Sequence, residues 1–71
     1  MAESVYKVIE LVGTSTESWE AAARNAVQTA GRTIRDLRVA EATRFDVTVE
    51  DGGISSFRVR LNISFKYERD E

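Results

Sequence analysis

The side chains that most often act as general bases or bind transition metals are missing from this sequence. Its 71 residues include no histidine and no cysteine. A general base would therefore have to be a carboxylate, a lysine or a tyrosine, and a metal site would have to use oxygen ligands. The adjacent carboxylates Glu50 and Asp51 stand at a predicted turn, where acidic residues are ordinary. The residue types thus favour a binding or storage protein over an enzyme.

Basic side chains on one predicted strand are candidates for binding an anion. Arg58, Arg60 and Lys66 are spaced so that they share one face of that strand. They could bind phosphate groups, or they could pair with acidic side chains of neighbouring strands. The turn at residues 13–15 precedes a predicted helix, where anions can bind, but it lacks the glycine spacing of a nucleotide-binding loop. A strand-to-helix turn with an N-cap is the simpler interpretation of that segment.

The elements that must position these residues follow from the spacing of apolar side chains. Residues 5–12 are rich in β-branched side chains, which is typical of a strand. From Glu17 to about Asp36, apolar residues recur at steps of three and four, which predicts a helix of about 20 residues and about 30 Å. Trp19 falls on this stripe, so we expect it in the core and not on a ligand platform. Thr14 and Glu17 fit a capping box, with Ser15 or Thr16 as the alternative N-cap.

Two long strands follow the helix. Residues 39–50 and 54–68 both alternate apolar and polar side chains, and Asp51-Gly52-Gly53 between them predicts a hairpin. The apolar faces are expected to hold Val39, Phe45, Val47 and Val49 of the first strand and Phe57, Val59, Leu61, Ile63, Phe65 and Tyr67 of the second. The opposite face carries charges of both signs. It can face water, or it can pair with another subunit.

The composition limits the classes of partner. We expect one domain, residues 1–71, which is too small to bury a large core and has no disulfide to stabilise it, so self-association is the expected source of stability. The net charge is −2, with no basic stripe for nucleic acid. No apolar run approaches the roughly 20 residues of a membrane span, and the N-terminus lacks the pattern of a signal peptide. We therefore expect a cytoplasmic protein without nucleic-acid or membrane partners.

Three segments of the sequence resemble the dodecin family. They are Val5-Tyr6-Lys7-Val8-Ile9-Glu10-Leu11-Val12-Gly13-Thr14-Ser15, Thr33-Ile34-Arg35-Asp36-Leu37 and Ile63-Ser64-Phe65-Lys66. The resemblance covers nearly the whole chain. It implies an α+β fold of the order β-α-β-β, in which a three-stranded antiparallel sheet wraps on one helix. It also implies a hollow homo-dodecamer that binds and sequesters flavins as stacked pairs, with coenzyme A as a ligand of some bacterial members.

The same resemblance indicates that flavin binding is weak or lost. Val39 stands where flavin-binding dodecins have a stacking tryptophan, and Arg58 stands where they have a glutamine that binds the flavin ring edge. Asp46 and Lys66 each replace an arginine of bacterial members. Arg58 could still attract a small anionic ligand, or it could pair with Asp46 and close the pocket.

Without the tryptophan, the chain is similar to the calcium dodecins. That similarity implies calcium or magnesium as a candidate cofactor, although no cofactor follows with certainty. Glu17 is the candidate metal ligand, because family members carry an acidic residue there beside the threefold axis of the shell. The alternative is that Glu17 only caps its helix. The sequence thus predicts a storage shell for a small ligand or ions, with a purely structural assembly as the alternative.

Overall fold

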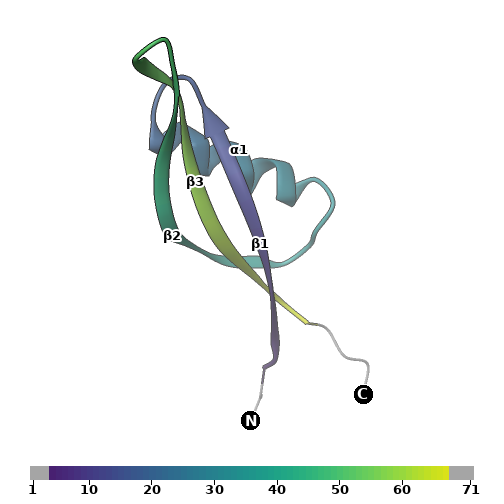
Figure 1. Cartoon of the computed structure of the whole chain (residues 1–71). Coiled ribbons are helices and arrows are strands. Elements are labelled where there is room, and N and C mark those ends of the chain that lie inside the picture. The colour runs from purple at the N-terminus through teal and green to yellow at the C-terminus, as the bar shows by residue number, and fades with distance from the viewer. Residues whose placement is uncertain (1–3, 68–71) are drawn as a thin grey trace.

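The sheet and its single helix have the predicted order (Figure 1). A computed structural model describes residues 4–67 and contains β1 (Tyr6–Ser15), α1 (Trp19–Gly31), β2 (Leu37–Glu50) and β3 (Gly53–Lys66). The strands form one antiparallel sheet in the order β1-β3-β2, and α1 lies across one face of it. The α+β fold with a three-stranded antiparallel sheet and one helix is therefore confirmed. Glu68, which was expected to end the last strand, lies outside the described residues.

The helix begins later than predicted. Its N-cap is Ser18, whose Oγ accepts a hydrogen bond from the backbone N–H of Ala21 at 3.0 Å. The predicted cap at Thr14, Ser15 or Thr16 is therefore wrong. The reason is that β1 continues through Ser15, which pairs with β3, so the chain is still extended where a cap was expected.

The helix also ends earlier than predicted, at Gly31 and not near Asp36. The apolar period continues past its end because Ile34 and Leu37 pack against the core from non-helical backbone. Asp36 takes a left-handed conformation, with φ of 62°, and this bend leads the chain into β2. With 13 residues, the helix is about 20 Å long and covers only part of the sheet.

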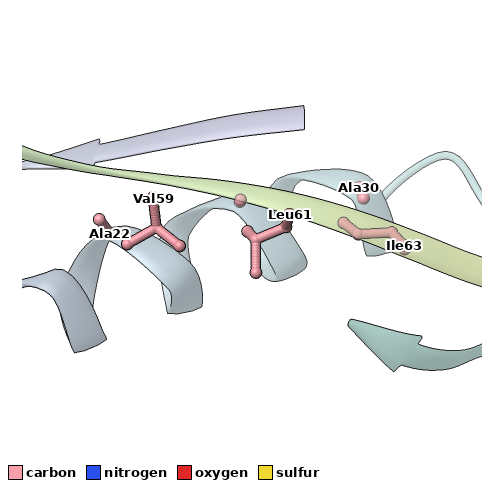
Figure 2. Close-up of a cluster of buried hydrophobic side chains, with 6 residues drawn as sticks. Ala22, Ala30, Val59, Leu61 and Ile63 are labelled. Carbon is pink, nitrogen blue, oxygen red and sulfur yellow. The ribbon is translucent and has the colours of Figure 1, made fainter. Parts of the chain in front are cut away.

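A small core forms between α1 and the central strand (Figure 2). Among the described residues, the buried hydrophobic side chains are Ala22, Ala26, Ala30, Val59, Leu61 and Ile63. The alanines let the helix approach the sheet closely. At Gly13 of β1, a Cβ atom would lie 2.1 Å from the carbonyl oxygen of Ala22, so only glycine fits there. This close contact fixes the position of the helix on β1.

Bulges in β2 change which side chains share a face. Arg38 and Thr43 are extra residues, because Leu37 and Val39 pair with adjacent residues of β3, as do Ala42 and Arg44. Val39 consequently lies opposite Ser64 on the polar face of the sheet, whereas Phe45 lies opposite Val59 on the helix face. The prediction that Val39 and Phe45 share an apolar face is therefore wrong.

The β2–β3 hairpin has the predicted turn. Asp51 and Gly52 both have positive φ angles, 52° and 79°, as a two-residue type I′ loop requires. Next to the turn, Ser55 is a further extra residue. The Oγ1 atom of Thr48 lies 3.0 Å from the Oγ of Ser55 and 2.6 Å from that of Ser56. These hydroxyl contacts join the two strands near the turn.

Many large apolar side chains remain exposed in the described part of the chain. They are Val5, Tyr6, Val8, Val12, Trp19, Val39, Phe45, Val49, Ile54 and Tyr67. A small core beside so many exposed apolar side chains is typical of a chain that buries them against other molecules. None of the helical residues described forms a segment long and apolar enough to cross a membrane.

Candidate ligand-binding face

The predicted ligand-binding residues lie on the side of the sheet that points away from α1, which we call the far face. The strand register assigns these residues to it: Tyr6, Val8, Glu10, Val12 and Thr14 of β1; Val39, Glu41, Arg44, Asp46 and Thr48 of β2; and Ser56, Arg58, Arg60, Asn62, Ser64 and Lys66 of β3. Val59, Leu61 and Ile63 point the other way, toward the helix (Figure 2). The far face thus combines exposed aliphatic side chains with charges of both signs.

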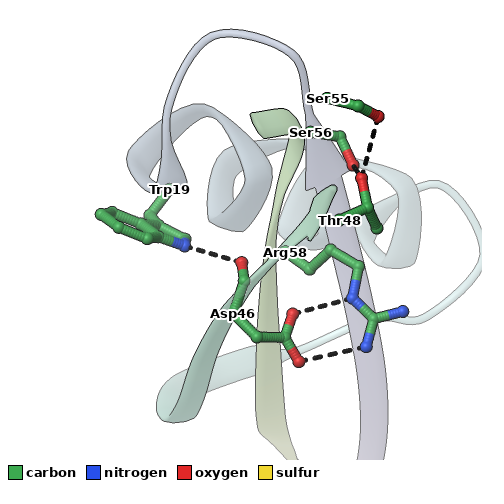
Figure 3. Close-up of polar contacts among 6 residues, drawn as sticks. All are labelled: Trp19, Asp46, Thr48, Ser55, Ser56 and Arg58. Carbon is green, nitrogen blue, oxygen red and sulfur yellow. Dashed lines mark hydrogen bonds and ion pairs between the residues drawn. The ribbon is translucent and has the colours of Figure 1, made fainter. Parts of the chain in front are cut away.

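Asp46 and Arg58 form a bidentate ion pair across the hairpin (Figure 3). Nε of Arg58 donates to Oδ1 of Asp46 at 2.8 Å, and Nη2 donates to Oδ2 at 3.1 Å. This hydrogen-bonded partner lowers the pKa of Asp46 below its usual value and raises the pKa of Arg58. Of the two alternatives for Arg58, the structure therefore shows the pairing with Asp46, which occupies its guanidinium fork.

Trp19 packs on the helix side of the same residues. Its indole N–H donates to the backbone oxygen of Asp46 at 3.0 Å (Figure 3). Its ring contacts Phe45 and Phe57 edge-to-face, with centroid distances of 6.0 and 5.1 Å. Trp19 keeps an exposed fraction of 39%, so it lies at the margin of the core and not inside it. It connects the start of the helix to β2 and does not reach the far face.

The predicted ligand-binding residues all lie on the far face, but within one chain they fall into two separate groups. Val39 is opposite Ser64, and Lys66 is two residues further along β3. Arg58 precedes Ser64 by six residues, which corresponds to about 20 Å along a strand. Val39 and Lys66 therefore lie toward one end of the far face, and the Asp46–Arg58 pair lies toward the other. The two groups therefore do not form one compact site within a chain.

A second charged group lies between these two ends, and sequence reasoning did not single it out as a site. Arg44 pairs with Arg60 across β2 and β3, and Nη1 of Arg60 lies 3.5 Å from Oε1 of Glu10 on β1. Together with Thr43 and Asn62 they line a shallow hollow of about 410 Å³. Arg44 and Arg60 lie two residues from the Asp46–Arg58 pair in the same regular stretch, and the bulge at Thr43 follows directly after them.

Glu17, the candidate metal ligand, lies exposed between β1 and α1. Its backbone N–H donates to Oγ of Ser15 at 2.9 Å. It is not the helix cap, because Ser18 has that role. Within residues 4–67, no group of three or more acidic side chains is placed to hold a metal ion. The described residues of a single chain therefore do not supply a complete cation site around Glu17.

Comparison with known proteins identifies the family. The model of the Dodecin family matches residues 5–68. The chain belongs to the dodecin family. It is 48% identical to calcium dodecin of Mycobacterium tuberculosis over 63 residues, which cover 89% of each chain. It is 39% identical to dodecin of Thermus thermophilus over 64 residues, which cover 90% of this chain and 93% of the relative.

Solved structures agree with this assignment. The dodecin from Streptomyces coelicolor superimposes with a TM-score of 0.92 at 37% identity, covering 99% of this chain and all of its own. Calcium dodecin of Mycobacterium tuberculosis, described as calcium chelating with a novel calcium-binding site, gives a TM-score of 0.82 at 44% identity. That match covers 96% of this chain and 97% of the other. The predicted family is thus confirmed.

Proposed function

We propose that this chain forms a hollow homo-dodecameric shell that binds and stores a small ligand or ions. The observation that carries the proposal is the imbalance, within residues 4–67, between six buried hydrophobic residues and the large apolar side chains left exposed on both sides of the sheet. Burial of apolar surface is the main driving force of association, and closed symmetric assemblies are its usual result. Membership of the dodecin family supports the shell as that result.

We further propose that flavin is a poor ligand of this shell. Val39 offers an aliphatic side chain where a flavin-binding dodecin would offer an aromatic ring. The guanidinium of Arg58 is already bound by Asp46, so it is not available to bind a flavin ring edge. Loss of the stacking tryptophan would place the chain in the branch of the calcium dodecins, and the 48% identity to one of them supports that placement.

A divalent cation is the ligand that this branch suggests. Symmetry would bring copies of Glu17 together, and calcium or magnesium would relieve the repulsion between their carboxylates. The calcium dodecin that this chain resembles supports calcium over magnesium. A small anionic ligand such as coenzyme A is the second candidate, because the far face also carries Arg44 and Arg60.

The alternative within the same fold is a structural assembly that holds no small ligand. No catalytic residue is proposed, because the sequence has no histidine and no cysteine. The cytoplasmic location and the lack of nucleic-acid and membrane partners stay predictions.

Native mass spectrometry of freshly purified protein tests the proposal, because it gives the subunit number and any bound mass together. We expect twelve copies of the chain with additional mass from ions or a small ligand. A stable monomer or dimer at micromolar concentration would contradict the shell. Twelve copies with no additional mass, before and after incubation with calcium, would favour the structural alternative.

A further inference from the structure

We propose that the hollow at Arg44 and Arg60 binds a phosphate group of a small molecule. The hollow is lined by Glu10, Thr43, Arg44, Arg60 and Asn62, so all three strands contribute to it. This inference rests on the proposed function, because it names a ligand class and a place on the far face. It does not require the shell, because one chain supplies every residue.

The arginines of the far face, Arg44, Arg58 and Arg60, differ in how fully their guanidinium groups are occupied. Arg58 makes two hydrogen bonds to Asp46, at 2.8 and 3.1 Å. Arg60 has one looser contact, 3.5 Å from Glu10, which exceeds the 2.7–2.9 Å of a charge-assisted hydrogen bond. For Arg44, no ion pair is formed with any residue in the described range 4–67. The capacity to bind an anion is therefore concentrated at Arg44 and Arg60.

The register makes this pair unfavourable without an anion. Arg44 and Arg60 stand directly opposite each other on the same face, and like charges in this arrangement destabilise a sheet. The hydroxyl of Thr43 donates to the backbone oxygen of Arg60 at 3.2 Å, which holds the adjacent bulge against this pair. An anion between the two guanidinium groups would remove their repulsion.

A phosphate group suits this pair better than a carboxylate. Guanidinium groups bind phosphate oxygens in a bidentate manner, and a phosphate monoester carries nearly two negative charges at neutral pH, enough to match two arginines. The side-chain amide of Asn62 in the lining supplies a further donor. Glu10 opposes binding, because its carboxylate competes for Arg60.

Calorimetric titration with inorganic phosphate and with phenyl phosphate tests the site. We expect Arg44→Gln and Arg60→Gln each to weaken binding by about tenfold, as expected when a charge-assisted contact is removed. Glu10→Gln should strengthen binding, by about threefold, because the competing carboxylate is gone. Arg24→Gln, which removes the same charge from the exposed side of α1, is the matched control and should change binding less than twofold.

The outcomes separate this site from general charge attraction and from the shell. Equal loss in Arg24→Gln and Arg44→Gln, or no gain in Glu10→Gln, would overturn the site. Binding of phenyl phosphate, with inorganic phosphate much weaker, would support a phosphate-bearing organic ligand over free phosphate. Light scattering on the same samples reports the assembly. If a monomer binds phosphate, only the proposed shell is contradicted. If the chain forms a dodecamer that does not bind phosphate, only the proposed phosphate site is contradicted.

Discussion

Asp46 is held from both sides of the sheet. Its carboxylate accepts two hydrogen bonds from Arg58 on the far face, and its backbone oxygen accepts one from the indole of Trp19 on the helix side. Both side chains of the ion pair are about 40% exposed, at 38% for Arg58 and 41% for Asp46, so water and salt screen the interaction. The pair therefore orients β2 and β3 more than it stabilises the fold.

The lowered pKa of Asp46 gives the first prediction. Its folded-state pKa lies below the ordinary value of 3.8, mainly because of the hydrogen bonds from Arg58. The ion pair contributes stability above that ordinary value, and this contribution is lost as the pH falls through the folded-state pKa. Asp46→Asn should therefore lose less stability than the wild type between pH 5 and pH 2, as measured by urea unfolding. Parallel curves for the two proteins would contradict the expectation.

Flavin affinity tests the assignment of Val39 and Arg58. We expect the wild type to quench flavin fluorescence only weakly, and Val39→Trp/Arg58→Gln to gain tight binding. A stacked aromatic ring contributes about 1–3 kcal/mol, by analogy with base stacking. Val39→Leu/Arg58→Gln is the matched control, because it breaks the ion pair without adding an aromatic ring. Submicromolar quenching by the wild type, or equal gains in both double variants, would contradict the assignment.

At the scale of single residues, the sequence predicted contacts between regular strands well and contacts at irregularities poorly. The pairing of Arg58 with Asp46 was one of its two alternatives, because both residues lie in a regular stretch of the hairpin. The pairing of Arg44 with Arg60 lies in the same stretch, and it was not singled out because the register of this stretch depends on the extra residue Ser55 next to the turn. Nothing in the alternation of side chains announces a bulge before the strands are paired.

Among the elements, the contact between α1 and β1 depends most on one residue. Gly13→Ala would place a methyl group 2.1 Å from the Ala22 carbonyl oxygen and 2.9 Å from the Ala26 side chain. Because the backbone must then move, we expect a loss of about 1–3 kcal/mol, the usual cost of overpacking. Urea unfolding measures it.

Gly31→Ala is the matched control for Gly13. The added methyl group there would meet only the side chain of Leu37, at an ordinary contact distance of 3.8 Å. Replacing glycine by alanine in a helix is favourable by about 0.5–1 kcal/mol, so this variant should be as stable as the wild type or more stable. Similar losses in both variants would show that the position of α1 does not depend on Gly13.

The elements themselves were predictable where local chemistry decides them. Asp51 and Gly52 specify the hairpin turn, and the β-branched start specifies β1. The helix ends were misjudged for a physical reason. Apolar side chains after Gly31 pack on the core from irregular backbone. The helical spacing of apolar residues in the sequence therefore continues beyond the last residue of the hydrogen-bonded helix.

For the whole molecule, calcium gives the last prediction. If copies of Glu17 meet around a symmetry axis, calcium should raise the thermal midpoint and a chelator should lower it. Glu17→Gln should abolish both shifts, whereas Glu50→Gln, which removes the same charge near the hairpin turn, should keep them. Differential scanning calorimetry measures these midpoints. An unchanged midpoint with calcium, with chelator and in Glu17→Gln alike would exclude a cation role for this residue.

The sequence allowed a definite prediction of the family and of a dodecameric assembly, but it did not identify the ligand. The described residues of one chain do not complete a site at Glu17, and Val39, opposite Ser64, lies six residues of β3 away from Arg58. Sites shared between subunits depend on symmetry, which no pattern along one strand encodes.

The bulge at Thr43 decides which side chains of β2 reach the far face. If Thr43 paired regularly, opposite Leu61, the residues of β2 from Val39 to Ala42 would exchange faces relative to Asp46. Val39 would then turn toward the helix, and Ala40 would take its place on the far face. During divergence within this fold, an inserted residue that is taken up as a bulge therefore preserves the ligand contacts beyond it, whereas one that enters the regular pairing replaces them without any substitution.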